Sequence, residues 1–489
     1  MAQPAQREIN LKLLAMVTFL ICLTLLVAAY FVYGAYLDRV CKIDTKAAVP
    51  SATLYDGVDY IPMPRWRTFL IQLLNIAGIG PIFGAIMGAC FGPVVFLWIT
   101  FGGILVGAMH DYLSGVILLR NDGLSLPEIV GRYLGKNALI FMRALSLVLL
   151  ILVGVVFMRS PASILSGMFE TIPYWGWIAI VFAYYFIATM VPIDKLIGKI
   201  YPLFGAALIF MAVGLLVILL TGDYTITNLT LESIHNHQIN AHNLPIIPTL
   251  FITVACGAIS GFHATQSPLM ARCMNNEGEA RMIFYGSMIT ESIIALIWAA
   301  IGMAFFHGPD ALVATMAEHG NDAAWAVKTI TDSTLGKVGG FIALLGVVAC
   351  AITSGDTAFR SARLIVADIL KIEQRSLVKR FAIALPLFAI GVVLLFVDFD
   401  VVWRYFAWTN QTMSVITLWM IVAYLNKHKR NIWSAIPPAV FMSYICISFV
   451  FVSNQFIGME NRPMAYILAG ITTIALTFIM WRKVLQSNN

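Results

Sequence analysis

Two glycine-rich stretches inside apolar segments decide the fold of this chain. They read Asn75-Ile-Ala-Gly-Ile-Gly-Pro81 and Ala255-Cys-Gly-Ala-Ile-Ser-Gly-Phe-His-Ala-Thr-Gln-Ser-Pro268. In a helix interior Gly costs about 1 kcal/mol and Pro about 3 kcal/mol relative to Ala, so each stretch predicts an interrupted helix. At membrane depth, unwound backbone is tolerated only where it faces protein or a water-filled cavity. For either stretch alone, a kinked helix packed closely through its glycines is the alternative.

The composition places these stretches in a membrane. Of 489 residues, 60% are hydrophobic and 11% are charged, and the mean hydropathy is +0.86. Soluble chains carry about 25% charged residues, so this chain cannot cover its surface with polar groups. A soluble enzyme, a nucleic-acid-binding protein and a disordered scaffold are thereby excluded. The seven cysteines are scattered without a Cys-x-x-Cys motif, which indicates buried apolar side chains rather than a disulfide or metal framework.

The sequence predicts an all-α polytopic membrane protein with about 13 transmembrane helices, because one span needs about 20 apolar residues. The first apolar stretch is too long for a signal peptide and no small-x-small cleavage site follows it, so it counts as a span. The predicted spans are residues 11–33, 68–89, 93–118, 138–157, 175–191, 202–221, 245–269, 283–306, 338–359, 381–397, 402–425, 434–453 and 464–481.

The distribution of positive charge predicts the orientation. Alternate loops, together with the C-terminal tail, hold 23 of the 31 Lys and Arg residues. Cytoplasmic loops carry the positive excess, so the N-terminus is predicted outside and the C-terminus inside.

The two interrupted spans lie five spans apart and run in opposite directions. Corresponding broken helices in two halves indicate an inverted-repeat transporter with its site near the bilayer midplane. A single transporter domain over 1–489 is predicted, with repeat one at 68–221 and repeat two at 222–425. The first helix and its cytoplasmic loop (1–67) and two C-terminal helices (426–489) would be peripheral.

The same stretches resemble a known family. The residues that carry the resemblance are Asn75–Gly84, Asn121-Asp-Gly-Leu-Ser-Leu-Pro-Glu128, Ala255–Gln266, Ile352-Thr-Ser-Gly-Asp-Thr-Ala-Phe-Arg360 and the loop Asp56–Pro62. They are similar to the carbon starvation protein A family of bacterial inner-membrane transporters. Leu70-Ile-Gln-Leu-Leu74 stands where long members carry His-His-Phe, so the chain resembles the shorter branch. The resemblance implies a LeuT-like fold of five plus five spans and ion-driven secondary uptake of peptides or pyruvate.

Polar groups at the two interruptions are the candidate substrate-binding residues. Helix ends there would offer unpaired N–H groups to a carboxylate, which suits pyruvate and a peptide C-terminus equally. His263 could hydrogen-bond substrate, titrate, or be satisfied by a neighbouring carbonyl. The predicted substrate-binding residues are Asn75, Gly78, Gly80, Ser260, His263 and Gln266.

A second group of residues is predicted to couple transport to a cation. The resemblance implies that, as in LeuT-like transporters, the first broken helix meets the third helix of repeat two at a sodium site. Asp356 could instead form an ion pair with Arg360 one helical turn away, and Glu291 at mid-depth could serve only packing. The predicted cation-coupling residues are Ala77, Thr353, Ser354, Asp356, Thr357 and Glu291.

Other polar features leave packing and transport open as alternatives. His110 and Asp111 lie toward the cytoplasmic end of one span, Arg143 lies in the next, and residues 409–412 form a polar patch in span 11. The outer loop 307–336 falls where LeuT-like proteins keep an external lid. The outer loop 222–244 carries His235, His237 and His242, which form a weak metal-site candidate without an obvious acidic partner.

These observations predict a secondary active transporter of the bacterial inner membrane that imports peptides or a small carboxylate such as pyruvate, with proton or sodium coupling. A channel and a nutrient or starvation sensor are the alternatives. The chain has no Walker A, His-Glu-x-x-His or Gly-x-Ser-x-Gly motif, so an enzyme is not expected. The expected partners are a small-molecule substrate and the lipid bilayer, without nucleic acid, cofactor or resident metal; the oligomeric state is left open.

Overall fold

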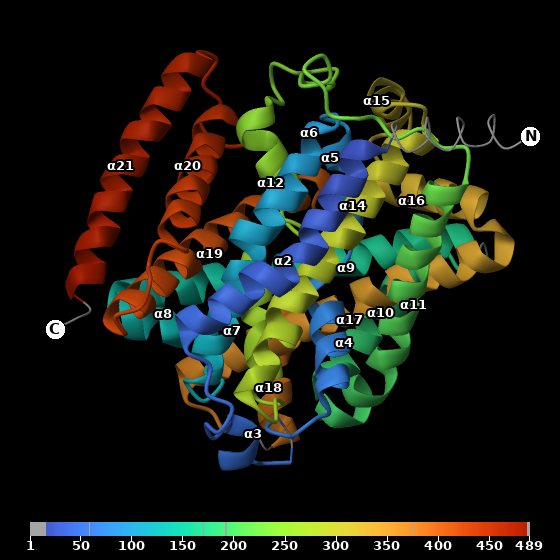
Figure 1. Cartoon of the computed structure of the whole chain (residues 1–489). Helices are drawn as coiled ribbons and strands as arrows, with labels where there is room; N and C mark the ends of the chain where they lie inside the picture. The colour runs from blue at the N-terminus through green and yellow to red at the C-terminus, as the bar shows by residue number, and fades with distance from the viewer. Residues whose placement is uncertain (1–15, 58, 170, 191–192, 375, 487–489) are drawn as a thin grey trace, which may run out of the picture.

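The computed structural model describes residues 16–57, 59–169, 171–190, 193–374 and 376–486, and the regular structure in these ranges is helical (Figure 1). Among these residues, eight helices are long and apolar enough to cross a membrane. A ninth span is the bent pair α4 (Arg65–Ile76) and α5 (Gly80–Ala89), whose axes turn through 48°. The expectation of an all-helical, multi-span membrane protein is confirmed.

The helices follow the predicted spans in order. The first half contains α2 (Val17–Cys41), α3 (Pro50–Thr53), α4, α5, α6 (Val94–Leu97), η1 (Trp98–Ala108), α7 (Met109–Leu119), α8 (Leu126–Leu134), α9 (Lys136–Met168), α10 (Tyr174–Met190) and α11 (Ile193–Thr221). The second half contains η2 (Ile246–Leu250), α12 (Phe251–Thr253), α13 (Gly261–Ala271), η3 (Glu277–Glu279), η4 (Arg281–Gly286), α14 (Ser287–Phe305), α15 (Pro309–Glu318), α16 (Ala323–Thr334), α17 (Gly336–Leu370), α18 (Leu377–Leu394), α19 (Phe399–Lys427), α20 (Ile436–Val452) and α21 (Arg462–Gln486).

Two helices are much longer than their predicted spans. Helices α9 and α17 have 33 and 35 residues. At 1.5 Å per residue each reaches about 50 Å, well beyond a hydrocarbon core of about 30 Å. They pack against each other, and a Cβ at Gly154 of α9 would run into the ring of Phe359 of α17. The apolar run in the sequence predicts only the part of each helix that crosses the lipid. The additional turns are stabilised by contacts with neighbouring helices.

The first helix also differs from its predicted bounds. It begins at Val17 and runs to Cys41, where Lys42 takes up a left-handed conformation with φ of 50°. The first residues of the predicted span 11–33 lie outside the described residues. The helix continues past residue 33 because its last turns pack on protein, with Leu37, Val40 and Cys41 buried.

Both predicted interruptions are present, and the second packs against the start of the helix that follows the first. Residues 77–79 separate α4 from α5, and residues 254–260 separate α12 from α13. A Cβ at Gly80, the last residue of the predicted first interruption, would come 2.5 Å from Cys256, so the two predicted interruptions face each other. The second one ends earlier than the predicted Cys256–His263, because α13 starts at Gly261; His263 therefore lies in its first turn.

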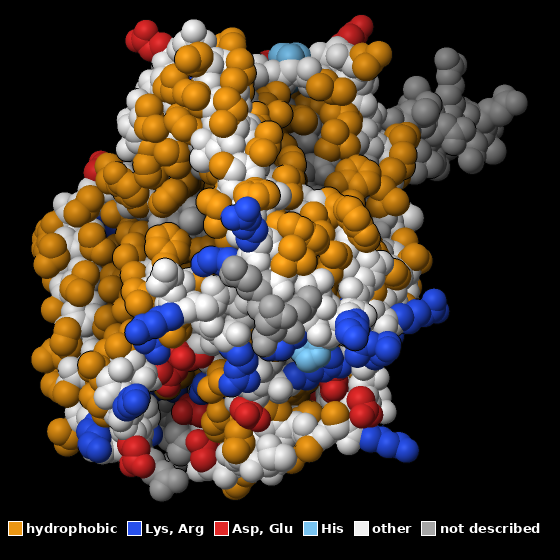
Figure 2. All heavy atoms as spheres, turned by 90° about the vertical axis from the view of Figure 1, so that its left-hand side faces the viewer, with side chains coloured by type: hydrophobic (Ala, Val, Ile, Leu, Met, Phe, Trp, Pro, Cys, Tyr) orange, Lys and Arg blue, Asp and Glu red, His pale blue; other side chains and the backbone are white. Residues whose placement is uncertain are grey.

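Apolar and basic side chains are distributed unevenly along the long axis of the molecule. Figure 2 shows hydrophobic side chains over the upper and middle parts of one face, with most Lys and Arg side chains in the lower half. Helix α3 lies at this lower end and α15 at the opposite end (Figure 1). An apolar belt bounded by charge is the surface that a bilayer requires.

Candidate functional site

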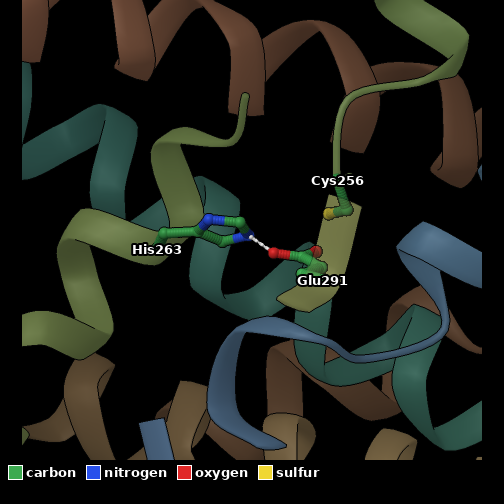
Figure 3. Close-up of side chains that lie close together, drawn as sticks. All are labelled: Cys256, His263 and Glu291. Carbon is green, nitrogen blue, oxygen red and sulfur yellow. Dashed lines mark ion pairs between the residues drawn. The ribbon is translucent and has the colours of Figure 1, made fainter. Parts of the chain in front are cut away.

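Ionisable side chains from three helices meet beside the second interruption. Asp111 comes from α7, His263 from α13 and Glu291 from α14, and all three are fully buried. Asp111 Oδ2 lies 2.8 Å from His263 Nδ1. His263 Nε2 lies 3.4 Å from Glu291 Oε2 (Figure 3). The other oxygen of Asp111 lies 2.8 Å from Nδ1 of His110. The result is a chain of alternating imidazoles and carboxylates inside the protein.

Cys256 joins this group from the unwound segment itself. Its sulfur, one carboxylate oxygen of Glu291 and a ring nitrogen of His263 all lie within 4.8 Å of one another (Figure 3). The thiol is free, buried, and 3.7 Å from the hydroxyl of Ser260. The side chains of Cys256, His263 and Glu291, here called the Cys-His-Glu cluster, thus converge on one point.

Several polar atoms of the cluster have no hydrogen-bond partner among the described residues. Within the described part of the chain, Nε2 of His263 and both carboxylate oxygens of Glu291 make no hydrogen bond; their mutual contact is the 3.4 Å ion pair. Buried polar atoms are normally hydrogen-bonded, and each exception needs an explanation. A ligand or ion would supply the missing partner.

The N-terminus of α13 is occupied by a side chain from α19. The backbone N–H of Phe262 donates to Oδ1 of Asn410 at 2.7 Å, and the Ser260 hydroxyl lies 3.1 Å from the same oxygen. The expectation that this helix end presents free N–H groups to a carboxylate therefore fails at Phe262. The polar patch at 409–412 had suggested packing or cavity lining, and Asn410 acts as the cap.

A separate polar centre lies at the first interruption. The hydroxyl of Ser354 in α17 lies 3.0 Å from the carbonyl oxygen of Leu74 and 3.2 Å from that of Asn75. The thiol of Cys350, one turn earlier, contacts the carbonyl oxygen of Ala77. Helix α17 therefore meets the first interruption, as the sequence predicted for span 9.

The remaining polar groups of α17 point elsewhere. The hydroxyls of Thr353 and Thr357 bond to carbonyls of their own helix, at 3.0 Å and 3.1 Å. Asp356 accepts a hydrogen bond of 2.9 Å from the hydroxyl of Tyr201 in α11, and its Oδ1 has no partner among the described residues. The guanidinium of Arg360 donates to the Ala188 carbonyl at 2.6 Å.

Three further predicted residues are buried near these centres. Asn75 lies in the last turn of α4, and its side-chain amide has no partner in the described part of the chain. Gln266 donates to the Thr265 hydroxyl at 2.9 Å. A Cβ at Gly78 would lie 2.5 Å from the ring of Phe157, which closes over the first interruption.

The structure therefore divides the predicted residues between two places. Asn75, Ala77 and Ser354 lie at the first interruption, whereas His263 and Glu291 lie at the second. Glu291 was grouped with Ser354 as a cation-coupling residue, but its direct contact is His263. Asp111 was not counted as a site residue, although an ionisable residue in an apolar span is a functional candidate in itself.

A cavity of about 390 Å³, here called the vestibule, opens at the end that carries α15. Its wall includes Thr253 of α12, Val313 and Met316 of α15, and Arg404 of α19. Part of the predicted external lid, residues 307–336, thus borders a cavity. In the nearby histidine-bearing loop, His237 Nδ1 lies 2.7 Å from Oδ1 of Asp310.

At the opposite end, an ion pair between Arg120 and Glu277, here called the Arg120–Glu277 clasp, joins several segments. Arg120, at the end of α7, lies 2.5 Å from a carboxylate oxygen of Glu277 and donates to the Tyr424 hydroxyl at 3.0 Å. It also donates to the carbonyl oxygen of Cys41 at 3.0 Å, which ties in the end of α2. Arg143, considered for anion binding, pairs with Glu128 at 2.6 Å.

Solved structures share this fold. Crystal structures of manganese transporter variants from Eremococcus coleocola superpose with a TM-score of 0.53, covering 89% of this chain and 98% of that chain. The sequence identity is 12%, so the similarity concerns the fold alone.

Relatives in sequence are membrane proteins and transporters. An uncharacterized membrane protein of Haemophilus influenzae is 43% identical over 351 residues, 62% of this chain and 94% of that protein. The peptide transporter CstA of Escherichia coli is 27% identical over 57% of this chain and 48% of its own length. The pyruvate/proton symporter BtsT of Escherichia coli is 28% identical over 55% of this chain and 46% of its own length. The chain thus spans about half the length of these two named relatives.

The family described as carbon starvation protein CstA matches two overlapping segments, residues 14–175 and 161–337. Together they include both interruptions and all of the Cys-His-Glu cluster. The named relatives are transporters rather than enzymes. The chain belongs to the carbon starvation protein CstA family.

Proposed function

We propose that this protein is a secondary active transporter that imports a small carboxylate such as pyruvate, or a peptide, and couples uptake to a proton or sodium gradient. The observation that carries the proposal is the contact in the core between the second unwound segment, 254–260, and Gly80, the residue that directly follows the first, 77–79. Discontinuous helices of this kind form the substrate and ion sites of inverted-repeat transporters. The names of the relatives supply the two substrate classes.

Correspondences between the two halves support a LeuT-like inverted repeat with thirteen spans. The broken pair α4–α5 matches α12–α13. The next span of each half contains a π-helical stretch, η1 in one and η4 in the other. The span after that is the longest in its half, α9 or α17. These parallels favour repeat units at 68–221 and 222–425, with 1–67 and 426–489 peripheral.

Ion coupling is proposed at the first interruption. Carbonyl oxygens of Leu74, Asn75 and Ala77 gather there around the Ser354 hydroxyl and the Cys350 thiol. Oxygen ligands of this kind suit a hard cation such as sodium.

The proton alternative uses Asp356, a buried carboxylate that accepts a hydrogen bond from Tyr201. Thr353 and Thr357 support the same turn of α17, and Glu291 is assigned to the second interruption.

Substrate is proposed to reach the interruptions from the vestibule. Its wall includes Arg404, a fixed positive charge, and Thr253 at the end of α12. The predicted substrate-binding residues, Asn75, Gly78, Gly80, Ser260, His263 and Gln266, lie at or beside the two interruptions. A substrate that enters the vestibule would reach them past Thr253.

The orientation is proposed with the N-terminus outside and the C-terminus inside, in the bacterial inner membrane. The vestibule would then face outward and the Arg120–Glu277 clasp inward. A single cysteine at Lys379 should resist a membrane-impermeant thiol reagent in intact cells, whereas one at His235 should react. The reverse pattern would refute this orientation.

Uptake into proteoliposomes tests the function. Purified protein should concentrate radiolabelled pyruvate or a labelled dipeptide when a proton or a sodium gradient is imposed, and the gain should vanish when the gradient is collapsed. Passive equilibration without accumulation would indicate a channel instead. Binding without any flux would favour a sensor.

A further inference from the structure

We infer that the Cys-His-Glu cluster is a binding site for a divalent transition-metal ion of the zinc type, held by Cys256 Sγ, His263 Nε2 and a carboxylate oxygen of Glu291. No metal-binding motif in the sequence predicts it, because Glu291 lies one span beyond Cys256 and His263. The inference concerns metal binding alone and does not depend on the proposed transport activity.

The spacing of the donor atoms suits one ion. Zinc binds sulfur at about 2.3 Å and nitrogen or oxygen at about 2.0–2.2 Å, so donors around it lie roughly 3–4 Å apart. The three donor atoms here lie within 4.8 Å of one another, and His263 Nε2 and Glu291 Oε2 are 3.4 Å apart. Small rotations of the side chains would bring all three into range.

The histidine is already oriented as a ligand. Its Nδ1 faces the carboxylate of Asp111 at 2.8 Å, which directs Nε2 toward Glu291 and Cys256. Metal-binding histidines nearly always donate their other ring N–H to a carboxylate or carbonyl, which fixes the tautomer and raises ligand basicity. Asp111 is itself held by His110 at 2.8 Å, so the supporting shell extends one residue further.

The atoms that would bind the ion are also atoms without hydrogen bonds. Nε2 of His263 and both oxygens of Glu291 lack a hydrogen-bond partner within the described residues, and both side chains are fully buried. Leaving such atoms unpaired is unfavourable, and more so for charged groups. An ion at this point satisfies all of them at once.

The charge balance favours a divalent ion over an empty site. Glu291 and Asp111 bring two carboxylates into the core, and a bound Cys256 would add a thiolate. Buried charge is tolerated only when it is paired. A divalent cation offsets Glu291 and Cys256 together, and leaves Asp111 to its two histidines. Three protein ligands leave a fourth tetrahedral position open for water or another ligand.

The competing arrangement uses no metal. In it, a protonated His263 bridges Asp111 and Glu291 as an ion triad, and Cys256 is an ordinary buried thiol. The two arrangements differ in one measurable respect, because only the metal site gives the thiol sulfur a bond to an ion. The experiment therefore detects directly whether the sulfur of Cys256 binds the ion.

The probe is Co²⁺ added to the chelator-treated full-length protein in lipid nanodiscs, without substrate or ion gradient. We expect one Co²⁺ per chain, a sulfur-to-cobalt charge-transfer absorption, and displacement by Zn²⁺. Cys256→Ser should abolish that absorption, whereas Cys446→Ser, which changes a buried cysteine of α20, should leave it unchanged. Asp111→Asn should weaken Co²⁺ affinity about 10- to 100-fold while keeping the absorption.

X-ray absorption of the Co²⁺-loaded wild-type protein keeps the inference falsifiable even if a variant fails to fold. One sulfur and two or more nitrogen or oxygen neighbours are expected. The inference is overturned if Co²⁺ does not bind in a 1:1 ratio, if no sulfur ligand is seen, or if the absorption survives Cys256→Ser. If a protein that fails these tests still transports substrate actively, the metal site is rejected and the proposed function stands.

Discussion

Gly80 of α5 lies so close to Cys256 that a Cβ at Gly80 would come 2.5 Å from both the Cβ and the Sγ of Cys256. Real side chains do not approach so closely, so this glycine allows the second unwound segment to pack against the start of α5, directly after the first. Cys256 in turn belongs to the Cys-His-Glu cluster. The first interruption therefore supports one wall of the second.

Gly80→Ala should separate the two interruptions. Overpacking of a well-packed core costs about 1–3 kcal/mol, so we expect a lower unfolding temperature and at least a tenfold loss of uptake. Adding Cys256→Gly should recover part of the stability, because it removes the atoms that clash. Gly302→Ala is the matched control, since its Cβ would meet Ile86 at an ordinary 3.8 Å. Equal effects of Gly80→Ala and Gly302→Ala would contradict the proposed contact.

Ser354→Ala should reveal the coupling ion. The Ser354 hydroxyl is within 3.2 Å of two carbonyl oxygens of the first interruption. If sodium binds there, loss of one oxygen ligand worth about 1–2 kcal/mol should raise the sodium concentration for half-maximal uptake about 5- to 30-fold. Asp356→Asn should then retain sodium dependence, whereas proton coupling reverses the two results. Ser448→Ala removes a buried hydroxyl of α20 that has no hydrogen-bond partner among the described residues, and serves as the control.

Tyr201→Phe should destabilise the fold through Asp356. The Tyr201 hydroxyl donates to Oδ2 of this fully buried carboxylate at 2.9 Å. A buried acceptor left without its donor costs about 1–3 kcal/mol, so the unfolding temperature should fall. In a double-mutant cycle with Asp356→Asn, the two losses should be less than additive. Strict additivity would show that the two groups do not interact.

Glu277→Gln should loosen the Arg120–Glu277 clasp. Because Glu277 lies four residues after Cys273, in the segment between α13 and η4, the loosened segment should expose this buried thiol. Burial raises the pKa of the Cys273 thiol to about 12, so almost none is ionised at neutral pH and it should react slowly with maleimide. When the clasp loosens, the pKa falls toward about 8.5 and the thiolate fraction at pH 7 rises. We expect at least about tenfold faster labelling of Cys273, located by mass spectrometry of digested protein.

The control for the clasp is another ion pair. Lys328 and Asp332 form an exposed pair at 2.8 Å near the end that carries α15. Lys328→Gln should leave Cys273 labelling unchanged, since exposed pairs contribute little. Unchanged labelling in Glu277→Gln as well would show that the clasp does not protect this thiol.

The interruptions are the part of the fold that the sequence predicted best. The first was expected near Ala77–Gly80 and lies at 77–79, because Gly78, Gly80 and Pro81 act on the backbone locally. The approach of Ser354 to it was expected from the resemblance to LeuT-like transporters. The end of the second interruption was missed by three residues, because Asn410 caps Phe262 and lets α13 begin at Gly261.

The sequence by itself determined that the chain is an all-helical membrane protein, the order of its apolar segments, and the positions where helices break. Composition and backbone preference act over a few neighbouring residues, so they can be read along the chain. Only the tertiary structure brought Asp111 to His263, which are 152 residues apart, and set Cys256 and Glu291 beside them. Contacts of this kind depend on how helices pack and on which side chains face inward, and no local pattern encodes that choice.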